Sequence, residues 1–156
     1  MKSFILLKQD ENKTYAIDTG GTVHELDVEP LVFLNERCIR CGSTIRGRKE
    51  AFCRMVHARQ KPAVLVSETS REIWFPTLGD KSRLCQWICY NYLLSAKPAD
   101  TFYTNLTFIT GTKVKVPCNI RTIRLQMSRC ERFLNMIDEN CTGLPIAENV
   151  MDYLRK

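Results

Sequence analysis

Residues 37–61 read RCIRCGSTIRGRKEAFCRMVHARQK and form the most unusual stretch of the chain. This stretch holds eight arginine and lysine residues against one acid, Glu50, so its net charge is +7. The whole chain of 156 residues carries only +6 at pH 7, which leaves the remainder close to neutral. Concentrated positive charge opposes compaction through self-repulsion, but it gains affinity for a polyanion through counterion release. The charge pattern therefore predicts a nucleic-acid-binding segment, and a merely solvated surface is the alternative interpretation.

The basic stretch is predicted to lie in two short helices, within residues 30–58, that flank a glycine loop. Pro30 suits the first turn of a helix, and the apolar residues after it recur at helical spacing as far as Cys38. Gly42 is expected to end this helix. A second helix is expected over 48–58. The apolar face of this second helix is expected to consist of Ala51, Met55 and Ala58.

Most of the remaining chain alternates apolar and polar residues and is punctuated by turn residues, which predicts an antiparallel sheet. Strands are expected at 3–7, 14–18 and 22–26, in a hairpin at 63–75, as one long central strand with both faces covered at 84–94, and in a hairpin at 100–118. The predicted fold class is α+β, with a largely antiparallel sheet. We expect residues 1–156 to form a single domain.

The last clear element is an amphipathic helix expected at about 120–137, where apolar residues recur at alternating spacings of three and four. Its apolar stripe predicts either core packing or a dimer seam. Its arginines make it a second candidate for phosphate contacts. Residues 138–156 are acidic and are expected to include a mobile tail.

Composition favours a folded cytoplasmic protein. Hydrophobic residues make up 44% of the chain and charged residues 26%, as in ordinary globular domains. The N-terminus, MKSFILLKQDENK, has only four consecutive apolar residues, too few for a signal peptide or a membrane span. We therefore expect the eight cysteines to be mostly reduced and buried.

Two chemical alternatives remain open at this stage. Cys38, Cys41, Cys53 and His57 have spacings that resemble those of a zinc knuckle. The abundant cysteines also leave a cytosolic cysteine enzyme as an alternative, although no pairing signature marks a nucleophile. The run GSTIRGRK at 42–49 approaches a phosphate-binding P-loop but lacks the hydroxyl residue that binds magnesium.

Four motifs within residues 37–88 occur together in an unusual combination. In chain order they are Cys38-x3-Gly42-Ser43-x3-Gly47-Arg48-Lys49, Lys61-Pro62 before a strand, Phe75-Pro76-Thr77-Leu78, and Cys85-x-Trp87-Ile88. This combination resembles the ComK family, the competence transcription factors of Gram-positive bacteria. The resemblance covers about a third of the chain.

The resemblance implies a DNA-binding transcriptional activator of competence (DNA-uptake) genes that binds A/T-rich boxes through the minor groove. It implies a bacterial, nucleoid-associated protein that is no enzyme and needs no cofactor or metal. The expected partners are double-stranded DNA and further copies of the chain, as a dimer or dimer of dimers, with RNA polymerase and an adaptor–protease system as additional candidates and no membrane.

The expected DNA-binding residues come from two sources. The resemblance assigns Gly47, Arg48 and Lys49, and charge alone adds Arg40, Arg46, Arg54 and Arg59. Arg40, Lys49, Arg54 and Arg59 are expected to contact phosphates. Either Arg46 or Arg48 is expected to enter the narrow minor groove, where negative potential attracts arginine.

Overall fold

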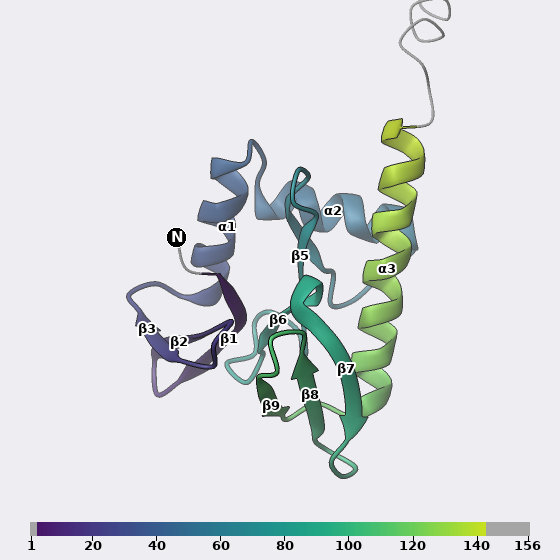
Figure 1. Cartoon of the computed structure of the whole chain (residues 1–156). Helices are drawn as coiled ribbons and strands as arrows, with labels where there is room; N and C mark the ends of the chain where they lie inside the picture. Colours follow the sequence, from purple (N-terminus) through teal and green to yellow (C-terminus); the bar gives the residue numbers. More distant parts are fainter. Residues whose placement is uncertain (1–2, 143–156) are drawn as a thin grey trace, which may run out of the picture.

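The computed structural model describes residues 3–142 and shows three helices around two antiparallel sheets (Figure 1). The strands are β1 (Phe4–Asp10), β2 (Lys13–Asp18), β3 (Val23–Leu26), β4 (Val64–Ser67), β5 (Glu72–Pro76), β6 (Trp87–Cys89), β7 (Leu93–Pro98), β8 (Thr104–Phe108) and β9 (Lys113–Val116). The helices are α1 (Pro30–Arg40), α2 (Ile45–Val56) and α3 (Ile120–Thr142), with a short 3-10 turn, η1 (Tyr90–Tyr92). The predicted α+β class is confirmed.

The larger sheet has the strand order β3-β2-β1-β6-β5-β4, and the smaller one has the order β7-β8-β9. Apolar side chains on the two faces of the larger sheet belong to two separate clusters. Trp74 and Trp87 lie in the cluster that includes Leu34 of α1. Phe75 and Ile88 lie in the other cluster, with residues of α2, α3 and the smaller sheet. The larger sheet is therefore covered on both faces, and β6 is the central strand that the sequence predicts.

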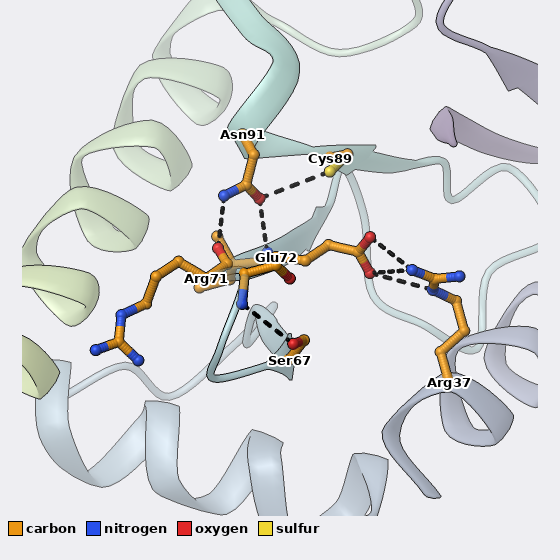
Figure 2. Close-up of polar contacts among 8 residues, drawn as sticks. Arg37, Ser67, Arg71, Glu72, Cys89 and Asn91 are labelled. Carbon is orange, nitrogen blue, oxygen red and sulfur yellow. Dashed lines mark hydrogen bonds and ion pairs between the residues drawn. The ribbon is translucent and has the colours of Figure 1, made fainter. Parts of the chain in front are cut away.

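The prediction of one long strand at 84–94 is wrong, because the chain bends at η1 and passes from one sheet to the other. Asn91 explains the bend. Its Oδ1 accepts a hydrogen bond from the backbone nitrogen of Ile73 at 2.8 Å, and its Nδ2 donates to the carbonyl oxygen of Arg71 (Figure 2). The side chain thus satisfies backbone groups beside β5 that a continuing strand would have paired.

The connection between α1 and α2 follows the prediction closely. Gly42 has φ +86, a left-handed conformation that favours glycine, and its nitrogen donates to the carbonyl of Ile39. Helix α2 begins earlier than predicted because Thr44 caps it, with Oγ1 accepting from the backbone nitrogen of Gly47 at 3.2 Å. The buried residues of α2 are Phe52 and Val56; of the predicted face, Met55 packs half-buried against the same core and Ala58 is buried just after the helix.

Helix α3 packs lengthwise against the body of the protein and runs past the end of α2 (Figure 1). Its apolar stripe, including Ile123, Cys130 and Ile137, is buried in the monomer, so the core-packing interpretation holds and the dimer-seam alternative is wrong. The ring centroids of Phe52 and Phe133 lie 5.1 Å apart. Helix α3 continues to Thr142, so residues 138–142 are helical; the rest of the predicted mobile tail, 143–156, lies outside the described residues.

Candidate nucleic-acid interface

The first turn of α2 is open to solvent. Thr44, Arg46 and Gly47 are all exposed. A Cβ placed on Gly47 would lie 3.4 Å from Thr44 Oγ1, which is an ordinary van der Waals contact. The backbone N–H groups of Ile45 and Gly47 already donate to Asn35 Oδ1 and Thr44 Oγ1, so the positive end of the helix dipole and the exposed Arg46 are what favour an anion at this position. The predicted site residue Gly47 therefore lies on the exposed surface at the start of α2.

Three arginines of the predicted site are exposed: Arg40, Arg46 and Arg59. Within residues 3–142, the structure gives none of them a hydrogen bond or an ion pair. Arg54 is also open, with 81% of its side chain exposed and only a loose 3.8 Å contact to Glu50 on the same helix. Such a contact contributes little, because water screens exposed ion pairs. These four arginines remain available to an outside anion.

Arg48 and Lys49 are arranged differently. Arg48 Nε donates to Ser43 Oγ at 3.0 Å and its Nη1 lies 3.1 Å from Glu68 Oε1, which leaves the Arg48 side chain only 14% exposed. Lys49 forms an ion pair with Asp80. Glu68 lies in the β4–β5 turn and Asp80 in the loop after β5. The two motif cations therefore fasten α2 to the larger sheet in this state.

Arg37 likewise connects α1 to the larger sheet. Its Nη2 lies 2.6 Å from Glu72 Oε1 and 2.8 Å from Oε2, and its Nε lies 3.1 Å from Oε2, so the guanidinium grips the carboxylate of β5 with two nitrogens (Figure 2). Bidentate pairs of this kind are the strong form of the arginine–carboxylate contact. Arg37, like Arg48 and Lys49, thus has a structural partner outside the basic stretch.

The segment after α2 is held from the side by α3. Arg132 Nη2 donates to the carbonyl of Val56 at 2.7 Å, and Arg129 Nη1 donates to that of Gln60 at 3.3 Å. The buried Gln126 donates to the carbonyls of Lys61 and Pro76, each at 2.9 Å. Arg129 and Arg132 therefore stabilise the backbone that carries Arg59. The other arginines of α3, Arg121 and Arg124, are exposed.

The zinc interpretation is wrong for this fold. Cys38 is buried against the larger sheet, and burial raises the pKa of its thiol. Cys41 precedes α2, whereas Cys53 and His57 lie at its far end, about 12 Å further along at 1.5 Å per residue. Zinc needs all four ligands within about 2.3 Å of one point. Accordingly, no cluster of metal-ligating side chains occurs between residues 3 and 142.

The buried and the exposed cysteines should differ sharply in the rate at which their thiols are alkylated. Burial raises the pKa of the thiols of Cys38, Cys85, Cys118 and Cys130, and raises that of Cys89 to about 12. Because the thiolate is the reactive form, we expect alkylation of the native protein at pH 8 to modify the exposed Cys41 and Cys141 first, and the half-buried Cys53 next. Peptide mass spectrometry after timed iodoacetamide labelling measures this. Rapid labelling of one buried cysteine would instead support the cysteine-enzyme alternative.

Exposed arginines that have no partner within residues 3–142, such as Arg40 and Arg46, are typical of surfaces that bind nucleic-acid phosphates. The family model described as ComK protein matches residues 4–142, so the chain belongs to the ComK family. The chain is also 25% identical over 107 residues to the "Competence transcription factor" of Bacillus subtilis (strain 168). The aligned region covers 69% of this chain and 56% of that relative, so the chain spans little more than half the relative's length.

No solved structure matches the chain significantly. Within the part of the chain that the structure describes, every helix is too short or too polar to cross a membrane.

Proposed function

We propose that this protein is a transcription factor that binds double-stranded DNA and activates competence genes, and that it reads A/T-rich boxes through the minor groove. Family membership and the name of the relative support the class of function. The observation that carries the DNA-binding mode is the exposed, unpaired Arg46 in the glycine-containing first turn of α2. Activity in the bacterial cytoplasm follows from the same proposal.

The dimensions of α2 decide how it can use a minor groove. A helix with side chains is about 10–12 Å across, and the minor groove is only about 6 Å wide. The helix therefore cannot enter the groove, but an arginine side chain from its first turn can. Of the two arginines considered for this role, Arg46 is free and Arg48 is engaged with Ser43 and Glu68. We assign groove insertion to Arg46.

The other site residues then contact the DNA backbone. Helix α2 is about 18 Å long at 1.5 Å per residue, so Arg54 and Arg59 lie far from Arg46 and would meet phosphates outside the groove. Arg40, at the end of α1, is close in sequence to Arg46 and would contact a phosphate on the near side. Arg48 and Lys49 add positive charge and keep α2 oriented through Glu68 and Asp80.

We further propose that the protein acts on DNA as a dimer or dimer of dimers, recruits RNA polymerase, and is open to adaptor-dependent proteolysis. The apolar stripe of α3 is buried in the core and is not available to a second copy. Contacts between copies must therefore use other surfaces.

Fluorescence anisotropy tests the binding mode. A labelled duplex with two A/T tracts about one helical turn apart is compared with a G/C-rich duplex at two salt concentrations. We expect much tighter binding to the A/T duplex, with a log–log salt slope of roughly −3 to −6 per bound copy of the chain. For Arg46→Ala we expect the ratio of the affinities for the A/T and G/C-rich duplexes to fall by about tenfold.

Arg48→Ala is the matched control within the same turn. Because Arg48 is tied to Ser43 and Glu68, we expect it to lower stability by about 1 kcal/mol and to keep the A/T preference. Equal affinity of the wild-type protein for both duplexes would contradict minor-groove readout. If Arg48→Ala loses the A/T preference and Arg46→Ala keeps it, then Arg48 and not Arg46 is the arginine that enters the groove.

A further inference from the structure

The smaller sheet has an outer face that contributes nothing to the core. Its inner face carries Leu106, Phe108 and Val116, which are fully buried. The residues between them point outward, because side chains alternate along a strand. Strand register places them in two rows across the sheet: Lys97, Asn105 and Lys115 in one, and Ser95, Thr107 and Lys113 in the other.

This outer face is cationic and polar. Its three lysines are exposed, and the strands β7, β8 and β9 contain no acidic residue. None of the three lysines forms an ion pair within residues 3–142. The remaining positions are serine, threonine and asparagine, which donate and accept hydrogen bonds. Charge complementarity therefore favours a polyanion on this face over an apolar partner.

The turn between β7 and β8 adds an exposed aromatic residue. Asp100 Oδ1 accepts from the backbone nitrogens of Phe102 at 2.8 Å and Tyr103 at 2.9 Å, which fixes the turn. The Phe102 side chain is nevertheless 74% exposed. Lys115 Nζ lies 4.8 Å from the Tyr103 ring centroid, so this turn continues the lysine row. A rigidly held, exposed phenylalanine beside lysines can contact a base or a deoxyribose ring.

The exposed arginines Arg40, Arg46, Arg54 and Arg59 form an arginine surface around α2. The smaller sheet adjoins this surface near Arg59. Lys61, just after α2, lines a hollow of about 570 Å³ together with Arg59 and Lys81. It also lines a second hollow, of about 260 Å³, together with Phe102 and Tyr103. The first hollow also contains the acidic Asp80, so Lys61 is the cation that links the region of Arg59 to the β7–β8 turn.

We propose that the outer face of the β7-β8-β9 sheet and the Phe102 turn form a second DNA-contacting surface. Lys97, Lys113 and Lys115 contact phosphates, and the Phe102 ring contacts a base or sugar. Sheets are known to present side chains to DNA grooves, and apolar side chains are known to insert at base steps. This inference rests on the proposed function and extends the DNA contact beyond α2.

The test compares two double variants that remove the same charge. Lys113→Gln/Lys115→Gln changes the proposed surface, and Lys8→Gln/Lys13→Gln changes strands of the other sheet. For the first we expect, for each bound copy, a loss of about 10- to 60-fold in affinity at 0.1 M salt and a salt slope shallower by about 1.8. For the second we expect less than about a threefold loss. Phe102→Ala should weaken binding by about tenfold without changing the slope, because phenylalanine is uncharged.

Anisotropy titrations of the full chain on the A/T duplex give both readouts, and circular dichroism checks that each variant is folded. If the wild type binds DNA and the two double variants behave alike, the second surface is overturned while the proposed function stands. If the wild type binds no duplex even at low salt, the proposed function itself fails. Unchanged DNA affinity of Lys113→Gln/Lys115→Gln with lost binding to an acidic protein would assign the face to a protein partner and overturn the proposal.

Discussion

A triple variant with Arg40→Gln, Arg46→Gln and Arg59→Gln is expected to lose about 100- to 1000-fold in DNA affinity at 0.1 M salt. These three arginines are exposed and have no ion-pair partner within residues 3–142, so their charge is fully available to phosphates. Each phosphate contact contributes about 0.9 to the log–log salt slope, so the slope should become shallower by about 2.7 for each bound copy. Anisotropy titrations on the A/T duplex at several salt concentrations measure both quantities.

The control is a variant with Lys8→Gln, Lys13→Gln and Arg83→Gln, which removes the same net charge elsewhere. Lys8 and Lys13 lie on β1 and β2, and Arg83 lies in the loop before β6. General electrostatic attraction would make the two triple variants equivalent. Near-equal losses would therefore show that the arginine surface around α2 is not the binding site. Both variants should keep the wild-type stability within about 0.5 kcal/mol, because surface substitutions rarely cost more.

Local signals in the sequence predicted the elements that carry the site. The charge of the basic stretch lies on α1, on α2 and on the segment that follows them, as expected. Gly42 ends α1 because only a residue that tolerates positive φ closes that turn without strain. The alternation around Trp87 and Ile88 correctly predicted a strand covered on both faces. These features depend on neighbours within a few residues, which sequence patterns report well.

The partners of the motif cations could not be predicted in this way. Glu68 and Asp80 lie 20 and 31 residues from Arg48 and Lys49, in turns whose place depends on the finished sheet. No local pattern indicates such pairing. The sequence therefore indicated which residues are charged, but it could not indicate that Arg46 is free while Arg48 is engaged. That difference decides which arginine is assigned to the groove.

The hydrogen bonds that position the Arg59 segment could not be predicted either, because they too join residues that lie far apart in the sequence. Gln126 reads from sequence as one more polar residue on an amphipathic helix, yet it is buried and donates to two backbone carbonyls far away in the chain. Asn91 likewise breaks the predicted strand through contacts with residues 18 to 20 positions earlier. A buried amide side chain is recognisable only once the groups it satisfies are known.

Phe133→Ala is expected to lower the free energy of unfolding by about 3–5 kcal/mol. Phe133 is 1% exposed and packs against Phe52 of α2, so alanine would leave a cavity between α2 and α3. Urea unfolding followed by circular dichroism measures the loss. The matched control is Leu125→Ala, on the outer side of the same helix, where the side chain is 51% exposed and the expected change is below about 0.5 kcal/mol.

The two α3 variants also separate core packing from self-association through α3. If α3 joined two copies through its outer side, Leu125→Ala would weaken the assembly and its stability would depend on protein concentration. With the packing seen here, Phe133→Ala destabilises the protein, whereas Leu125→Ala keeps both the stability and the concentration dependence of the wild type. Because Gln126, Arg129 and Arg132 of α3 hold the backbone at 56–61, Phe133→Ala should also weaken DNA binding through Arg59 before the protein unfolds globally. Full DNA affinity in a folded but destabilised Phe133→Ala protein would show that the Arg59 segment keeps its position without α3.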